Sequence, residues 1–167
     1  NVNINNLKNF RNNFKTRAAL LSDQNFINVN NSKTKNMILS LDLINLYHKL
    51  SEKIDLSILR SASESFIGNN LCTIYRGQRL THRVLRHAYY SSQLSIHCKN
   101  FFENKVICDI GGGYGGLIRF LKHQNKNNTF VLVELPEVCL LANYFLKKCF
   151  PNSSIGTIKD FKNDQQI

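Results

Sequence analysis

The sequence predicts an α/β protein in which a parallel, doubly wound sheet follows an all-helical region. Apolar residues recur at helical spacing through most of the first hundred residues, and this period changes at Lys105. Two strand-helix units then follow one another before residue 150, which is the pattern of a parallel sheet. We therefore divide the chain into residues 1–100, a helical region on the cap or substrate side, and residues 101–167, the N-terminal half of the sheet domain.

The helical region contains four stretches with helical spacing. A polar, Asn-rich loop over residues 22–36 separates the first two, and Thr81 fits the N-cap of the last. The segment 71–80 stays ambiguous between a short strand and an irregular connection around Gly77. The expected helices span residues 7–21, 37–50, 55–66 and 81–98.

The sheet region begins with the apolar run 106–108, which ends in Asp109 and predicts a buried parallel strand. Five glycines within six residues follow, and a helix is expected directly after them. Residues 130–133 predict a second strand closed by Glu134, and residues 137–150 a second helix. A third strand could open at 155–158, so at most three strands of such a sheet are expected, and the chain reads as a piece of a longer protein.

The composition of the chain limits the kinds of partner that it is expected to bind. The 22 Lys and Arg against 11 Asp and Glu give a formal charge of +11, which favours anionic partners but also fits lysines spread over solvated faces. No arginine run or basic stripe interleaved with aromatics supports nucleic-acid binding. The sequence contains no apolar run of roughly 18 residues, so it predicts no membrane-spanning helix. The five cysteines form no CxxC pair, so we expect buried free thiols in a reducing cytoplasm and no metal site.

The glycine turn matches two kinds of nucleotide site. Gly111, Gly113 and Gly116 fit the GxGxxG spacing of dinucleotide enzymes, whereas Asp109, Gly111, Gly113 and Gly115 fit the D-x-G-x-G-x-G pattern of methyltransferases. A carboxylate at Asp109 would repel a pyrophosphate but can hold the ammonium group of S-adenosylmethionine. Asp109 therefore favours S-adenosylmethionine as the cofactor.

Glu134 lies 23 residues beyond Gly111, at the end of the second strand. Both cofactor classes place an acid there to accept hydrogen bonds from the ribose hydroxyls. Taken alone, Asp109 could simply cap the following turn and Glu134 could be an exposed residue at a strand end. Their spacing around one glycine cluster favours the functional interpretation.

The segments DIGGGYGG and VLVELPEVCLLANYFL resemble the class I S-adenosylmethionine-dependent methyltransferases, and most of all bacterial sugar O-methyltransferases. The resemblance covers about residues 70–162 and implies a Rossmann-like sheet. It further implies that Asp109, Gly111, Gly113 and Gly115 bind the cofactor, the first three at its methionine end, and that Glu134 binds its ribose. Asp160 could match the acid that contacts adenine in such enzymes, or it could be a solvated carboxylate.

Methyl transfer to a hydroxyl needs the acceptor oxygen held about 3 Å from the methyl group and a base close by. A polar and aromatic cluster precedes the first strand of the sheet. In it, His87 could be the base and Arg83 or Arg86 a clamp for a phosphorylated acceptor, or the cluster could be a solvated basic face with a tyrosine packed on the sheet. We assign no catalytic residue. The cluster consists of His82, Arg83, Arg86, His87, Tyr89 and Tyr90.

The resemblance implies an O-methyltransferase acting on a hydroxyl of a sugar or glycan precursor in polysaccharide synthesis. A second hypothesis is a truncated module that binds the cofactor without chemistry, and a third is an NAD(P)-dependent oxidoreductase. The expected partners are a small-molecule or glycan acceptor, which could be anionic, and a second copy of the chain. Self-association is expected because an incomplete parallel sheet exposes an apolar edge.

Overall fold

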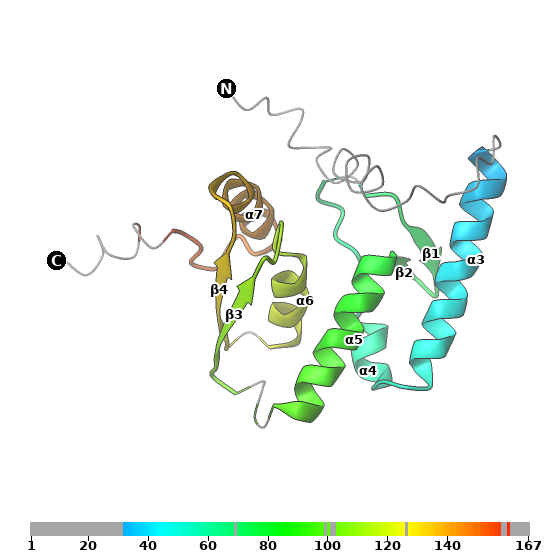
Figure 1. Cartoon of the computed structure of the whole chain (residues 1–167), viewed down its shortest axis with the longest axis horizontal. Helices are drawn as coiled ribbons and strands as arrows, with labels where there is room; N and C mark the ends of the chain where they lie inside the picture. Colours follow the sequence, from blue (N-terminus) through cyan, green and yellow to red (C-terminus); the bar gives the residue numbers. More distant parts are fainter. Residues whose placement is uncertain are drawn as a thin grey trace.

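The computed structural model describes residues 32–68, 70–98, 100, 103–125, 127–157 and 160. Within them a helical part that contains a β-hairpin stands beside a two-stranded parallel sheet, and α6 lies between the sheet and α5 (Figure 1). The helix predicted over residues 7–21 lies outside the described residues. The elements, in order, are α3 (Ser32–Ser51), α4 (Leu56–Arg60), β1 (Thr73–Tyr75), β2 (Gln78–Leu80), α5 (His82–His97), β3 (Val106–Ile110), α6 (Gly116–Gln124), β4 (Thr129–Val133) and α7 (Pro136–Cys149).

The first two described helices differ in length from the prediction. α3 begins at Ser32, inside the segment expected to be a loop, and α4 ends at Arg60 instead of residue 66. After α4, the backbone forms hydrogen bonds with residues outside the helix. The Glu64 N–H, for example, donates to the Arg79 carbonyl at 2.8 Å. A hydrogen bond to the hairpin therefore replaces the continuation of the helix.

Residues 73–80 form an antiparallel hairpin, so the prediction of an all-helical N-terminal region was wrong. Arg76 and Gly77 both have positive φ, as the tight two-residue turns of hairpins require. The buried Gln78 side chain donates 2.9 Å hydrogen bonds to the carbonyls of Leu59, in the last turn of α4, and of Ala62, just after the helix. This contact between distant segments fixes the hairpin against α4.

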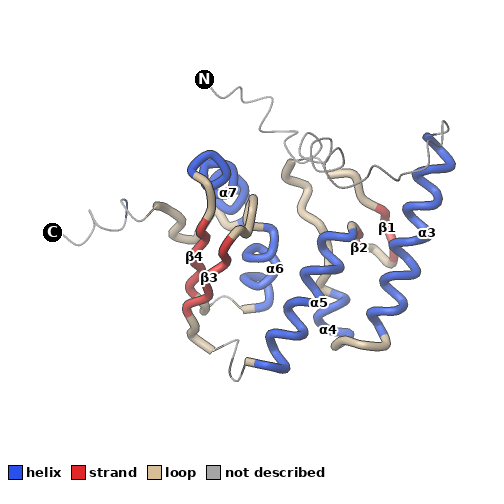
Figure 2. The backbone as a smooth tube through the Cα atoms, viewed as in Figure 1, coloured by secondary structure: helices blue, strands red, loops and turns tan. Residues whose placement is uncertain are grey.

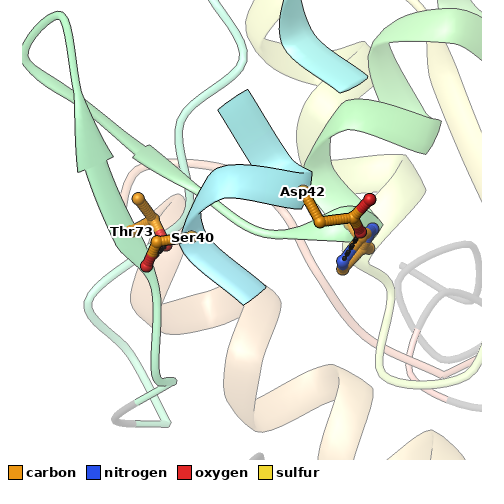
Figure 3. Close-up of polar contacts among 4 residues, drawn as sticks. Ser40, Asp42 and Thr73 are labelled. Carbon is orange, nitrogen blue, oxygen red and sulfur yellow. Dashed lines mark hydrogen bonds and ion pairs between the residues drawn. The ribbon is translucent and has the colours of Figure 1, made fainter. Parts of the chain in front are cut away.

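The N-terminal core joins α3, α4, the hairpin and α5, and Phe120 of α6 completes it. Polar contacts also link α3 to its neighbours, and Figure 3 shows two of them. The hydroxyls of Ser40 and Thr73 share a 3.0 Å hydrogen bond, and Asp42 pairs with His82 at 3.3 Å. The buried residues of this core are Leu43, Tyr47, Leu50, Ile54, Ile58, Leu59, Ala62, Leu80, Val84, Leu85, Ala88 and Phe120.

α5 runs as predicted, and its N-cap is the predicted Thr81, whose hydroxyl accepts a 3.1 Å hydrogen bond from the Val84 N–H. The helix follows the hairpin directly. Its buried face packs into the N-terminal core through Val84, Leu85 and Ala88, which leaves another side for the sheet region.

β3 and β4 pair in parallel, from Val106 opposite Thr129 to Ile110 opposite Val133, as predicted for the start of a doubly wound sheet. The segment 155–157 is not a strand, and residues 158 and 159 lie outside the described part of the chain. The structure thus bears out a parallel pair of strands alternating with helices.

Among the described residues, helices cover one face of this sheet and leave the other open (Figure 2). Ile118 of α6 and Phe145 and Leu146 of α7 pack against the inner side chains of β4, whereas Val106 and Ile110 on the other face are 73% and 80% exposed. The prediction of buried strands was therefore wrong, because the apolar run contains residues of both faces. The prediction of buried cysteines was also wrong, because Cys98 and Cys108 are exposed and the other three, Cys72, Cys139 and Cys149, are half-buried.

Candidate functional site

The turn between β3 and α6 is built on glycines that alternate in conformation. Gly111, Gly113 and Gly115 have φ values of 74°, 59° and 82°, in the left-handed region that favours glycine. The Gly111 N–H donates to the Val133 carbonyl at 2.9 Å, so the turn starts where the two strands end. Within this turn, the glycines with positive φ are the three that the D-x-G-x-G-x-G pattern requires.

These glycines face different surroundings. A Cβ on Gly111 or Gly113 would meet no atom within 4 Å, so both border open space. A Cβ on Gly112 would overlap the Asp109 carboxylate and lie 2.6 Å from Leu132 Cδ1. Gly115 is buried instead, and its Cβ would lie 3.0 Å from Leu146 Cδ1. The turn therefore offers bare backbone to a ligand at Gly111 and Gly113, while Gly115 packs on α7.

Asp109 sits under this turn with its carboxylate partly buried. Its Oδ2 is buried and has no hydrogen-bond partner among the described residues. Burial, and secondly the neighbouring charge of Glu134, raise the pKa of Asp109 above its ordinary value. A buried acceptor without a donor costs about 1–3 kcal/mol, so a ligand that supplies N–H groups here would remove a penalty from the free protein.

Glu134 reaches the same turn from the end of β4. Its Oε1 accepts a 3.1 Å hydrogen bond from the Gly113 N–H, and its Oε2 a 2.9 Å hydrogen bond from the Leu135 N–H. An ionised carboxylate has about four acceptor sites, so two remain for a ligand's hydroxyls. Glu134 thus combines a structural contact with the capacity to bind a diol.

A cleft of about 310 Å³ separates the turn from α5. This volume lies at the lower end of the range for ligand pockets, about 300–1,000 Å³. Asp109, Gly111 and Gly113 line the cleft, whereas Gly115, Glu134 and Asp160 are not among its lining residues. The α5 wall consists of Arg83, Arg86, His87 and Tyr90, and the opposite wall of Asp109, Gly111, Gly112, Gly113, Tyr114, Gly116 and Leu117.

The structure places four members of the polar cluster predicted on α5 in the cleft and the other two outside it. Residues 83, 86, 87 and 90 follow helical spacing and so share the face that meets the glycine turn. His82 pairs with Asp42 on α3, and Tyr89 is 40% exposed outside the cleft lining. The cluster is therefore neither wholly solvated nor packed on the sheet.

Within the α5 wall, the side chains differ in their contacts. The Arg83 guanidinium lies 5.1 Å from the centre of the Tyr114 ring, a cation–π distance. His87 is buried, and its Cε1 would lie 2.9 Å from a Cβ on Gly116. Sequence reasoning missed Tyr114 as a cleft residue, although its place inside the glycine cluster was the available signal.

Asp160 lies apart from this arrangement. Its Oδ2 accepts hydrogen bonds from the Thr157 N–H at 2.6 Å and the Thr157 hydroxyl at 2.9 Å. These two bonds lower the pKa of the exposed Asp160 carboxyl. The contact is that of a local turn, and a role in adenine binding stays a prediction.

The described residues include no group of three or more His, Cys, Asp or Glu that could hold a metal ion. In the same part of the chain, no helix is long and apolar enough to cross a membrane. No protein-family model, curated protein or solved structure matches the chain. The site must therefore be interpreted from its own chemistry.

Proposed function

We propose that the chain binds S-adenosylmethionine at the glycine turn and serves transfer of its methyl group to a hydroxyl of a sugar or glycan precursor. The observation that carries this proposal is the buried Oδ2 of Asp109, which lacks a donor in a cleft bordered by bare glycine backbone. The ammonium group of the cofactor would supply that donor together with a compensating charge.

The remaining groups of the cofactor also find complementary partners. Its carboxylate matches the guanidinium of Arg83, which lines the opposite wall of the cleft. Its ribose hydroxyls match the acceptor sites left on Glu134 beside Gly113. The ammonium and the carboxylate of the methionine end thus each find a group of opposite charge in the cleft lining.

A dinucleotide fits this charge arrangement less well. Asp109 and Glu134 lie close enough for the charge of Glu134 to raise the pKa of Asp109. A pyrophosphate at Gly111 and Gly113 would add negative charge beside both carboxylates. An NAD(P)-dependent oxidoreductase is therefore the weaker hypothesis, and NADH is the natural control ligand.

The bound cofactor would supply the reactive methyl group and the sulfur leaving group. The chain must orient the acceptor hydroxyl toward the cleft and receive its proton. His87 is the base on the α5 wall, across the cleft from the glycine turn. We propose His87 as the group that accepts this proton, because Asp109 is committed to the ammonium group.

The test is calorimetric titration with S-adenosylhomocysteine, and then with NADH. Asp109→Asn removes the charge beneath the turn, and Glu52→Gln removes an exposed charge after α3 as a matched control. We expect the wild type and the control to bind S-adenosylhomocysteine, and the Asp109 variant to bind at least about tenfold more weakly, since charged hydrogen bonds contribute about 1.5–3 kcal/mol. Folded wild-type protein that binds only NADH, or neither ligand, would sink the proposal.

A further inference from the structure

Two donors on the α5 wall are left over once the cofactor's groups have been matched. Arg86 and Tyr90 are neighbours one turn apart on α5, and both line the cleft. Arg86 is exposed and Tyr90 is 44% exposed. Among the described residues, neither the Arg86 guanidinium nor the Tyr90 hydroxyl makes a hydrogen bond or ion pair. The Tyr90 ring lies 6.2 Å from the ring of Tyr89, measured between their centres.

We propose that Arg86 and Tyr90 bind an oxyanion carried by the acceptor, a phosphate or a carboxylate, and this rests on the proposed function. Arginine presents a planar fork of donors that matches such groups in two-point geometry. The Tyr90 hydroxyl, one turn further along the same face, adds a neutral donor. The acceptor is then an acidic or phosphorylated sugar rather than a neutral one.

The charges in the cleft support this choice of substrate. Arg83 and Arg86 face a wall on which Asp109 is the lining carboxylate. If Asp109 holds the ammonium group and Arg83 the carboxylate of the cofactor, Arg86 stays uncompensated. The bound sulfonium adds a further positive charge to the cleft. A neutral acceptor would leave Arg86 without an anionic partner on the cleft walls, whereas an anionic acceptor would supply one.

A surface arginine provides the matched control. Arg60 ends α4, is exposed and lies outside the cleft lining. Arg60→Gln and Arg86→Gln change the net charge equally, so any general attraction of anions by the basic chain affects both variants alike. Tyr90→Phe removes the hydroxyl and keeps the ring.

The experiment is a ligand-observed NMR titration of the full chain with glucose 6-phosphate, glucuronate and glucose. Each titration is run with and without saturating S-adenosylhomocysteine. We expect the phosphate, the carboxylate or both to bind more tightly than glucose. Arg86→Gln should weaken that binding about tenfold or more and Tyr90→Phe by a smaller factor, because a charged hydrogen bond contributes more than a neutral one. Arg60→Gln, which lies outside the cleft, should bind both the charged sugars and S-adenosylhomocysteine like the wild type.

The outcomes separate the two proposals. Equal binding by Arg86→Gln and wild type, equal weakening by Arg60→Gln, or binding of glucose as tight as that of the charged sugars would overturn the oxyanion site. None of those results would change what the titration with S-adenosylhomocysteine says about cofactor binding. If that ligand fails to bind while Arg86→Gln still abolishes binding of the charged sugars, the proposed function falls and the oxyanion site stands.

Discussion

The Gly113 N–H donates a 3.1 Å hydrogen bond to Oε1 of Glu134, which joins the turn after β3 to the end of β4. The bond holds the acid against a glycine whose φ is 59°. A carboxylate fixed in this way needs little reordering to accept further hydrogen bonds from a diol. This preorganisation reduces the entropic cost of binding.

Glu134→Gln tests that relationship. The amide oxygen can still accept from the Gly113 N–H, whereas the amide nitrogen cannot accept from the Leu135 N–H. Because the contact with Leu135 is exposed and water can replace it, we expect the free energy of unfolding to fall by only about 1 kcal/mol. The charge that strengthens hydrogen bonds from the ribose is lost, and affinity for S-adenosylhomocysteine should fall about 5- to 50-fold. Calorimetry at neutral pH measures the affinity, and urea unfolding the stability. An unchanged affinity would show that Glu134 has only the structural role.

Asp109→Asn should move stability and affinity in opposite directions. The pKa of Asp109 is raised in the folded protein, so ionised Asp109 destabilises the fold. This penalty is absent below the unfolded-state pKa, near 3.8, and is fully present above the folded-state pKa. We therefore expect Asp109→Asn to unfold at a higher urea concentration than the wild type near pH 7. The gain in the free energy of unfolding should be less than about 1 kcal/mol, because the carboxyl is partly solvated.

The gain in stability of this variant should disappear as the pH falls below the ordinary pKa of an aspartic acid. Its affinity for S-adenosylhomocysteine should nevertheless be lower at neutral pH, because the ammonium group loses its counter-charge. Urea denaturation of the ligand-free chain across the acidic range checks the first effect. A variant that is less stable than the wild type at pH 7 would mean that Asp109 has a stabilising partner after all.

Gly112→Ala tests whether the turn has room for a side chain. The added Cβ would overlap the Asp109 carboxylate and press on Leu132, both of which lie under the turn. Overpacking of this kind costs about 1–3 kcal/mol. Gly156→Ala is a comparison outside the turn, where the nearest atom is the end of the exposed Asp160 side chain. We expect a clear loss of thermal stability only for Gly112→Ala, and equal losses would falsify the tight packing inferred at the turn.

The turn and its flanking elements could be predicted because their signals are local. An apolar run, an acid and clustered glycines lie within eleven residues, 106–116, and the structure forms β3, the turn and the start of α6 from them. The Thr81 cap is equally local, since its hydroxyl bonds an N–H three residues ahead. Such features need no knowledge of distant partners.

The hairpin and the cleft could not be predicted in this way because distant segments create them. β1 and β2 have three residues each, and the buried Gln78 fixes them against the carbonyls at the end of α4. Arg86 lies opposite the glycine turn because of the way α5 packs against α6, which the local sequence does not reveal. The exposure of Ile110 likewise depends on which face the helices cover. Self-association through that face stays a prediction.

Arg119 provides the last prediction, because it connects the two parts of the molecule. It lies on α6, is buried, and donates a 2.7 Å hydrogen bond from Nη2 to the Ser63 carbonyl in the N-terminal part. Burial lowers the pKa of Arg119 from its usual value, yet a guanidinium stays charged at neutral pH. The hydrogen bond therefore compensates a desolvated charge.

Arg119→Ala should lower the free energy of unfolding by about 2–4 kcal/mol, because it removes both the packing of the long side chain and the donor to the half-buried Ser63 carbonyl. Arg119→Lys should lose less, since a cation with a long stem is retained. Arg60→Ala, at an exposed position, should change stability by less than about 0.5 kcal/mol. If Arg119→Ala were as stable as Arg60→Ala in urea unfolding, the hydrogen bond of Arg119 to Ser63 would contribute nothing to the contact between α6 and the N-terminal part.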